Sequence, residues 1–438
     1  MTDPASRQSL ISLLLSRRSR RFGRGTRLNG GPLAYESQQE TRPLSLDDEA
    51  ALAFAACGIT NYVLGELPYQ TGDTSDAGSG NILVNLIGRT IASGDAVHSS
   101  IVFVINDDGA WMLKRPQDFP RTEIPALIQS AHEHEFTKLY EKSRVRVSDQ
   151  RLDVPRHLPF VPPFNKWSAN VAGSTYFLPV SELTALYINM LLTAFDDEHA
   201  YFVMDERNNY QAAGIGKFAK SKGGHLHDDP HDNRFGTIGA VETWLCEFTA
   251  WEQGAMMQNL ALMVEALGLG GFPHFAAYPY IWPQTLGFRM ANIPLAKTIG
   301  ANVFIKLGMR LLNKDVSMPT PLGLEVGGEV LIKPYCPPYY PNMQEAVLAF
   351  VDYKFGEGHG TLRNGGEHSA WRDAATVQKG IPHPSDRAIA ATIAYADYVY
   401  QRYGRFPAIS GPARTLLAYQ AHHLDEDFYP KFYKSKFL

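Results

Sequence analysis

The 438-residue chain contains little cysteine and no long hydrophobic run, and each shortage excludes a class of protein. Its three cysteines, Cys57, Cys246 and Cys336, are too few for a disulfide framework and form no CxxC metal motif, which is typical of a reducing compartment. No apolar stretch reaches the roughly 18 residues that a membrane helix needs. The net charge of −4 gives no general reason to expect nucleic acid as a partner. We therefore expect a cytoplasmic protein that binds neither membrane nor nucleic acid.

The residues that are present have the composition of a globular protein. Hydrophobic residues make up 45% of the chain and charged residues 20%. The 28 prolines and 37 glycines predict many loops, and the 11% aromatic content predicts a substantial core or a flat ligand. The length allows one large domain or two to three average ones.

One stretch, from Trp244 to Leu267, predicts a long helix that is apolar on most of its circumference. Such a helix belongs in the middle of a protein or in a subunit interface. Glutamate, glutamine and asparagine interrupt it too often for a membrane span. Gly268 and Gly270 follow and are expected to end it. We therefore predict a buried central helix.

An arginine cluster, Arg17–Phe22, follows a short predicted helix near the amino terminus. One interpretation is a solvated basic turn or a nucleic-acid patch. The other is an anion site, because guanidinium groups and the Ser19 hydroxyl suit a phosphate monoester. The motif alone leaves both open.

A second cluster contains His225, His227 and His231 in a Gly-, Lys- and Asp-rich stretch. Strand alternation would place the first two on one side, where the third could join them as metal ligands. The neighbouring glycines and Pro230 indicate a solvated loop instead. We favour the loop and keep a metal-dependent enzyme as an alternative.

Four segments, in this order, resemble the FMN-dependent nitroreductase superfamily. The chain looks most similar to its azoline-oxidase branch, which forms thiazoles and oxazoles in modified peptides. The segments are Arg17–Phe22 (family pattern RRSxRxF), Pro43–Thr60, Arg89–Ala96 and Glu252–Gly270 (family pattern ExGxxxQNLxLxAxALGLG).

The resemblance implies an α+β, nitroreductase-like fold with an antiparallel or mixed central sheet flanked by helices. It also implies a homodimer, with the long central helix at the twofold interface and FMN in contact with both subunits. Residues 1–340 would form the FMN-binding domain, with an insertion at about 205–235. Residues 341–438 would form a C-terminal helical extension packed on the same domain or on the dimer partner.

The same resemblance assigns cofactor-binding residues. The family pattern places the FMN phosphate at Arg17, Arg18, Ser19 and Arg21, and the ring and ribityl chain at Ser93, Gly94, Asp95, Pro273, His274 and Phe275. Turns that contain glycine and proline can present backbone donors to a flat ring without side-chain bulk. No catalytic acid or base is assigned, and His98 and His274 are candidates. Glu242, Glu247 and Glu252 on the central helix could act as bases, but we favour single structural roles for them, such as pairing with an arginine.

The function that follows is an FMN-dependent oxidoreductase that acts on an organic small molecule or a peptide-derived substrate. NAD(P)H or oxygen would be its electron partner. Family members often carry a second basic cluster after the last strand, whereas Pro334–Tyr340 contains no lysine or arginine. A non-catalytic binding subunit with an altered cofactor site therefore stays an alternative.

Overall fold

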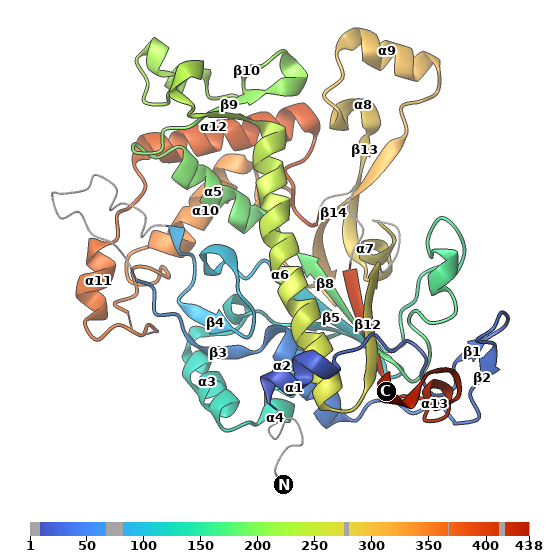
Figure 1. Ribbon diagram of the computed structural model, residues 1–438. Helices are drawn as coiled ribbons and strands as arrows, with labels where there is room; N and C mark the ends of the chain where they lie inside the picture. Colours follow the sequence, from blue (N-terminus) through green and yellow to red (C-terminus); the bar gives the residue numbers. More distant parts are fainter. Residues whose placement is uncertain (1–8, 67–81, 276–279, 367, 411–416, 438) are drawn as a thin grey trace.

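A six-stranded antiparallel sheet forms the centre of the molecule (Figure 1). The structure is a computed structural model that describes residues 9–66, 82–275, 280–366, 368–410 and 417–437. The strand order is β12-β16-β8-β5-β6-β7, and every neighbouring pair is antiparallel. The strands are β5 (Ser100–Asn106), β6 (Gly109–Leu113), β7 (Arg144–Ser148), β8 (Thr175–Ser181), β12 (Gly270–Phe275) and β16 (Leu417–His422). The predicted mixture of helices and antiparallel strands is confirmed.

The β5–β6 hairpin explains why this part of the sequence is a nearly continuous hydrophobic run. Every residue of both strands is buried. Ile101 and Phe103 pack into the core on one face of the sheet, and Val102 and Val104 pack into a second core on the other face. Since both faces are covered, no polar alternation is needed.

One face of the sheet is covered by α6 (Ile238–Ala266) and α2 (Leu46–Cys57). Both helices begin at side chains that cap their amino termini. Ser45 and Asp48 form the capping box of α2, and the Thr237 hydroxyl accepts from the Ala240 amide at the start of α6. The long central helix predicted from the sequence is therefore confirmed.

The prediction that this helix is buried all round is wrong within one chain. Trp244 and Trp251 are each 54% exposed and Phe248 is 37% exposed, all in the amino-terminal half of α6. The opposite side of the helix, with Met256 and Leu260, packs on the sheet. A helix that packs on one sheet buries only one side. Its outer side is excluded from solvent only where a further surface covers it.

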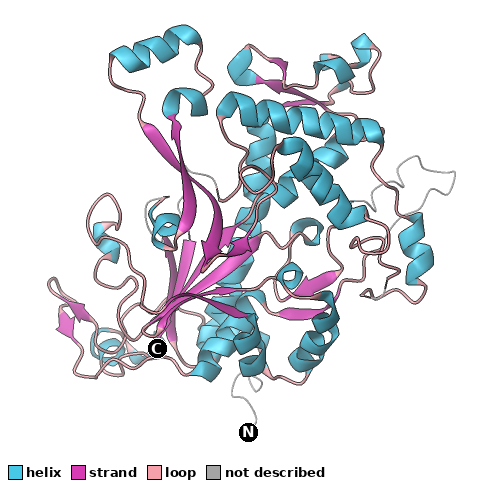
Figure 2. Cartoon of the chain, turned by 180° about the vertical axis from the view of Figure 1, so that it is seen from behind, coloured by secondary structure: helices cyan, strands magenta, loops and turns pink. Residues whose placement is uncertain are grey.

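Helices α5 (Thr184–Ala194), α10 (Met343–Phe355) and α12 (Asp386–Tyr403) pack on one another and on the other face of the sheet (Figure 2). Residues on both sides of position 340, such as Tyr187 and Tyr395, share this core, and their hydroxyl oxygens lie 2.8 Å apart. The Ser385 hydroxyl caps the start of α12, and Gly404, in the left-handed conformation, ends it. Strand β8 ends at Ser181, and α5 begins three residues later without a side-chain cap.

The C-terminal segment also supplies β16, a strand that the sequence pattern did not predict. It lies between β12 and β8, with Tyr419 paired to Phe177 and Gly271 paired to Ala421. Both strands that pair with β16 are distant in the chain. No hairpin turn next to β16 therefore indicates that it is a strand. As a result β12 becomes the edge of the sheet.

The remaining elements surround this centre. The helices are α1 (Leu10–Ser16), α3 (Ile124–His132), α4 (Phe136–Ser143), α7 (Ile281–Thr285), α8 (Leu295–Thr298), α9 (Val303–Leu311), α11 (Ala374–Gly380) and α13 (Phe428–Phe432). The strands are β1 (Arg27–Leu28), β2 (Tyr35–Glu36), β3 (Ile59–Tyr62), β4 (Ile87–Arg89), β9 (Phe202–Asp205), β10 (Gln211–Ala212), β11 (Phe235–Thr237), β13 (Phe288–Pro294), β14 (Ser317–Val326) and β15 (Glu329–Ile332). Within the described ranges, no helix combines the length and the hydrophobicity of a membrane span.

Candidate functional site

The arginine cluster lies along the edge strand β12. The backbone amide of Arg20 donates to the carbonyl oxygen of Gly271 at 3.1 Å. The Arg20 guanidinium also forms an ion pair of 2.9 Å with Glu265, near the end of α6. Phe22 is buried and stacks on Phe428, with ring centroids 4.0 Å apart. These contacts hold the amino-terminal segment against both β12 and α6.

A solvent-open cavity of about 560 Å³, the β12 cavity, lies where these segments meet. Its lining consists of Ser19, Arg21, Phe164, Asn165, Gly254, Met257, Phe272, Pro273, His274, Phe275 and Leu417. Five residues predicted to bind the cofactor are among them: Ser19, Arg21, Pro273, His274 and Phe275. Two segments that are distant in the sequence thus form one site.

Three oxygen atoms fix the Arg21 side chain at the rim of the β12 cavity. Its Nη2 donates to Ser168 Oγ at 2.7 Å, to Asn165 Oδ1 at 3.1 Å and to the Phe164 carbonyl at 3.0 Å. Its Nε is buried and has no hydrogen-bond partner in the described part of the chain. The guanidinium is therefore held in place through Nη2, while its buried Nε has no partner.

Two aromatic rings enclose the same guanidinium. Its central carbon lies 4.9 Å from the Trp167 ring centroid and 4.8 Å from that of Phe272, which are cation–π distances. Burial lowers the pKa of Arg21 from its usual value, because the charged form loses hydration there. A bound anion would compensate for that loss. The site thus favours a negatively charged group beside Arg21.

His274 offers a neutral acceptor on the cavity wall. Burial lowers the pKa of His274 to about 4, and the charge of Arg21 acts in the same direction, so the imidazole is neutral at pH 7. Nδ1 lies 2.9 Å from the Phe275 carbonyl, which can only accept, so Nδ1 carries the proton. Nε2 is buried and has no partner among the described residues. Its lone pair therefore makes no hydrogen bond with the described residues.

Gly254 leaves a bare patch of α6 backbone on the opposite wall. A Cβ atom built at this position would meet no heavy atom within 4 Å. Met257, one turn further along α6, supplies an apolar neighbour. The absence of a side chain at Gly254 thus leaves open space beside the helix.

Arg17 and Arg18 do not line the β12 cavity. Arg18 donates through Nη1 to the carbonyls of Leu15 and Arg17, each at 3.0 Å, and borders a neighbouring cavity of about 590 Å³ together with Arg20 and Arg24. Ser19 borders both cavities. The arginines of the cluster therefore face two different spaces.

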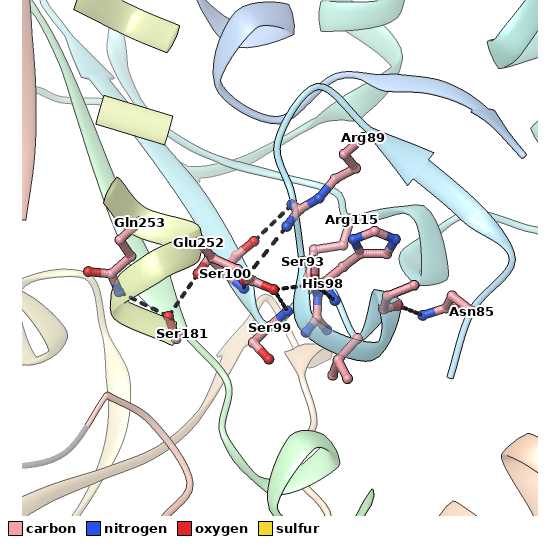
Figure 3. A network of polar contacts seen from close by, with 12 residues as sticks. Asn85, Arg89, Ser93, His98, Ser99, Ser100, Arg115, Ser181, Glu252 and Gln253 are labelled. Atoms are coloured by element: carbon pink, nitrogen blue, oxygen red, sulfur yellow. Dashed lines mark hydrogen bonds and ion pairs between the residues drawn. The ribbon is translucent and has the colours of Figure 1, made fainter. Parts of the chain in front are cut away.

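Ser93, Gly94 and Asp95 lie elsewhere, and Figure 3 shows Ser93 beside Glu252 of α6. The Ser93 hydroxyl donates to Glu252 Oε1, and a Cβ at Gly94 would lie 2.8 Å from the ring of Phe248. Asp95 accepts from Asn189 Nδ2 at 3.1 Å, and burial raises its pKa. None of these three residues lines the β12 cavity of the same chain.

Glu252 organises this second cluster (Figure 3). Its carboxylate accepts from the amides of Ser99 at 3.2 Å and Ser100 at 2.7 Å, and it pairs with Arg89 at 3.8 Å. Both members of the ion pair are buried. The expected structural role of Glu252 as the partner of an arginine is confirmed. The network ties α6 to the turn that precedes β5.

His98 belongs to the Glu252 network and not to the β12 cavity. Its Nε2 lies 2.6 Å from the Ile87 carbonyl, and its amide donates to Ser93 Oγ at 2.9 Å. Burial lowers its pKa well below the usual value, and the charge of Arg89 adds to the effect. Since its ring is enclosed, it is not placed to act on a ligand in the β12 cavity.

The three histidines of the Gly-rich stretch do not converge. His225 Nε2 contacts the Phe195 carbonyl at 2.9 Å, and His227 Nδ1 contacts Asp232 at 2.7 Å. His231 is exposed on the loop surface. Across the described ranges, no group of three His, Cys, Asp or Glu side chains could hold a metal ion. The structure therefore does not bring these three histidines together, and the stretch consists of loops and short 3₁₀ turns.

The segment Pro334–Tyr340, which lacks basic residues, does not reach the β12 cavity. Tyr335 packs edge-on against Phe350, and its amide donates to Thr184 Oγ1 at 2.6 Å. A lysine or arginine in this segment would not lie in the β12 cavity of the same chain. Its absence therefore does not change the charge of that cavity.

Sequence reasoning missed the segment that holds Arg21. Phe164, Asn165, Trp167 and Ser168 directly follow Pro162 and Pro163, and no motif marked them as part of a site. The available signal was a polar and aromatic run, Asn-Lys-Trp-Ser, directly after several prolines. Such a run is a plausible ligand wall, but nothing in it indicates which residue it contacts.

Comparisons with known proteins add distant similarity to solved structures. No protein-family model and no curated protein matches the chain. Among solved structures, the chain is similar to a candidate nitroreductase from Ralstonia eutropha JMP134, with 14% sequence identity and a TM-score of 0.29. The match covers 64% of this chain and 75% of the other. A superposition this loose carries no inference about fold or function.

His422 makes the free energy of unfolding of the protein depend on pH. It is buried on β16 beside Gly23 and Gly270, and burial lowers its pKa from 6.5 to about 4. The unfolded chain therefore binds a proton that the folded chain excludes, and stability falls as the pH drops from about 6.5 to about 4. We expect a loss of about 2 kcal/mol between pH 7 and pH 5 from this residue.

Urea unfolding at both pH values measures this loss. In His422→Gln the difference between pH 7 and pH 5 is expected to shrink by that amount, whatever its stability at pH 7. His231→Gln, on the exposed loop, is the control and is expected to leave the difference unchanged. An unchanged difference in His422→Gln would show that this imidazole is not the source.

Proposed function

We propose that the protein is an FMN-binding oxidoreductase that holds its cofactor in the β12 cavity. The observation that carries the proposal is the convergence of Ser19 and Arg21 with Pro273–Phe275 and the bare α6 backbone at Gly254. The sequence resemblance assigned the first two groups to opposite ends of one FMN molecule. In the structure they line the same space.

The cavity has the chemical features that FMN requires. Arg21, with its unpartnered Nε, and the exposed Ser19 suit the phosphate. The neutral His274 Nε2 suits a hydrogen-bond donor, and the space beside Gly254 suits a flat ring. A volume of about 560 Å³ lies in the usual range for small-molecule sites, roughly 300 to 1,000 Å³.

The chain's own residues have binding and positioning roles in this proposal. Arg21, clamped by three acceptors and two rings, would hold a negative charge in one place. His274 would accept a hydrogen bond and so orient the ligand. Met257, Phe272 and Phe275 would keep water from the apolar side. Bound FMN would supply two-electron redox chemistry. We propose an organic small molecule or a peptide-derived compound as the substrate and NAD(P)H or oxygen as the electron partner.

We further propose that the active form is a homodimer. The β12 cavity is open to solvent, and the exposed face of α6 continues from Gly254 through Trp251 to Trp244. A second copy on that face would remove apolar surface from water and cover the open side of the cavity.

The first test is the visible spectrum of the purified protein, followed by chromatography of the supernatant after heat denaturation. We expect flavin absorption bands and released FMN, or saturable binding of added FMN. Arg21→Gln is expected to weaken FMN binding roughly 10- to 100-fold, because a charge-assisted contact of about 1.5–3 kcal/mol is lost. Arg27→Gln is the matched control, since Arg27 is exposed and lines neither cavity.

A colourless protein that binds no added FMN would contradict the proposal. Equal loss of affinity in both arginine variants would place the phosphate elsewhere. Bound FMN without turnover of any hydride donor would instead favour the non-catalytic binding subunit.

A further inference from the structure

An arm extends from the body of the molecule and carries α9 at its tip (Figures 1 and 2). It consists of β13, α8, α9 and β14, residues 288–326. No residue of α9 is buried, and Phe304 is 85% exposed. The other large apolar residues exposed at the tip are Ile299, Val303, Ile305, Leu307, Leu311, Leu312 and Val316. An exposed apolar patch of this kind marks a contact with another protein or with a membrane.

The arm is basic, in contrast to the chain as a whole. The sequence contains no Asp or Glu between Glu265 and Asp315, although the net charge of the whole chain is −4. The basic residues of this interval are Arg289, Lys297, Lys306, Arg310 and Lys314. The last three are exposed at the tip, and no carboxylate in the described part of the chain forms an ion pair with them. The tip therefore presents positive charge that an anionic surface can neutralise.

The sequence of α9 places its apolar and basic side chains side by side along the helix. The apolar stripe consists of Val303, Phe304, Leu307 and Leu311, at spacings of three and four residues. Lys306 and Arg310 are four residues apart and form a basic row. Arg310 lies about 60° around the helix from Leu307, so the basic row borders the stripe. In a helix that lies flat on a membrane, such a stripe enters the acyl region while the bordering basic side chains reach the headgroups.

The dimensions of α9 suit a membrane surface and exclude a span. Its nine residues measure about 14 Å, less than half of the roughly 30 Å of a hydrocarbon core. The Asn302 side chain caps its start by accepting from the Ile305 amide. A protein partner would need an acidic surface that matches the shape of the tip. A fluid layer of anionic lipids supplies the charge and adapts to the shape, so the tip favours lipid.

We propose that the tip of the arm binds the surface of a membrane that contains anionic lipids. The expectation that the chain has no membrane partner rested on the net charge of the whole chain and on the lack of a span, and neither describes the arm. The inference goes beyond the proposed function and does not depend on it, because no residue of the arm lines the β12 cavity.

Cosedimentation of the full chain with vesicles tests the proposal. Each of three basic side chains near an anionic surface strengthens binding roughly fivefold. Vesicles of phosphatidylglycerol and phosphatidylcholine in equal parts are therefore expected to bind roughly 100-fold more tightly than vesicles of phosphatidylcholine alone. This preference is expected to shrink as salt is added, because ions screen the charges.

Two double variants separate the apolar and the basic contributions. Phe304→Asp with Leu307→Asp is expected to weaken binding to the mixed vesicles about 100-fold, since two apolar side chains no longer enter the membrane. Lys306→Glu with Arg310→Glu is expected to weaken it at least roughly 25-fold. All four side chains are exposed, so the midpoint of thermal unfolding is expected to stay unchanged.

Each double variant has a matched control at another surface. Leu348→Asp replaces an exposed leucine on α10. Arg372→Glu with Lys379→Glu reverses two exposed basic residues and so changes the net charge of the chain by the same amount as the α9 pair. Both controls are expected to bind the mixed vesicles as the wild type does.

A benzophenone side chain at position 304 identifies what the tip touches. Irradiation on the mixed vesicles is expected to attach lipid to the α9 peptide. A wild-type chain that binds no vesicles would overturn the proposal, as would vesicle binding that the α9 variants leave intact or that the charge control weakens equally. Crosslinks from position 304 to a protein chain in place of lipid would assign the tip to a protein interface and overturn it too. Flavin content is measured in the same samples, and its presence or absence decides the cofactor assignment independently.

Discussion

Gly254→Leu is expected to weaken FMN binding about 100-fold or more in a protein that still folds. The new side chain would extend from α6 into the β12 cavity, where a Cβ meets nothing within 4 Å. Ligand and leucine would then compete for the same space, at a cost of roughly 3 kcal/mol or more, which is a loss of about 100-fold in affinity. The helix itself gains, because leucine is favoured over glycine in a helix interior by about 0.8 kcal/mol.

Titration with FMN and thermal unfolding of the same preparation separate these two effects. Gly254→Ala is the matched variant: it adds only a Cβ, so it keeps the gain in helix stability with a much smaller loss of affinity. Unchanged FMN affinity in Gly254→Leu would show that the cofactor does not lie against this wall of α6. A variant that fails to fold would contradict the open space seen beside Gly254.

Glu252→Ala is expected to lower the free energy of unfolding more than any other single substitution proposed for this protein. The substitution leaves Arg89, whose side chain is 1% exposed, buried without a counter-charge. It also removes the acceptor for the Ser99 and Ser100 amides. Breaking a buried ion pair from one side costs about 3–5 kcal/mol.

Urea unfolding at pH 7 measures this cost. Glu247→Ala is the control, because Glu247 lies exposed on the same helix and is expected to change stability by less than about 0.5 kcal/mol. Removing both charges, with Arg89→Met and Glu252→Leu, is expected to recover a large part of the loss. A single variant within about 1 kcal/mol of wild type would show that the pair is not what holds the turn before β5 on α6.

Several elements were predictable because their causes are local. The capping box of Ser45 and Asp48, the cap at Ser385 and the turn between β5 and β6 are each decided by a few adjacent residues. The carboxy-terminal end of α6 was predictable as well, since Gly254 is the only glycine or proline between Trp244 and Gly268. The strand β16 was not, because its partners β12 and β8 lie far away in the chain.

The candidate site divides in the same way. Ser19, Arg21 and Pro273–Phe275 were identifiable from motifs, and the structure brings them to one cavity. The motif could not tell Arg21 from Arg17 or Arg18, which point elsewhere. That distinction depends on Asn165, Trp167 and Ser168, since these distant residues bind and stack on one guanidinium.

By itself, then, the sequence determined the periodic and capped elements, the lack of disulfides and the residue types available for an anion. Those properties depend on neighbours along the chain. Three features were decided by the tertiary structure alone. Strand β12 lies at the edge of the sheet, next to β16. Ser93 donates to Glu252 in a buried network, and Arg21 lines the β12 cavity. Each of these depends on contacts between residues more than a hundred positions apart, where burial and hydrogen-bond geometry select one partner among many that the sequence alone would allow.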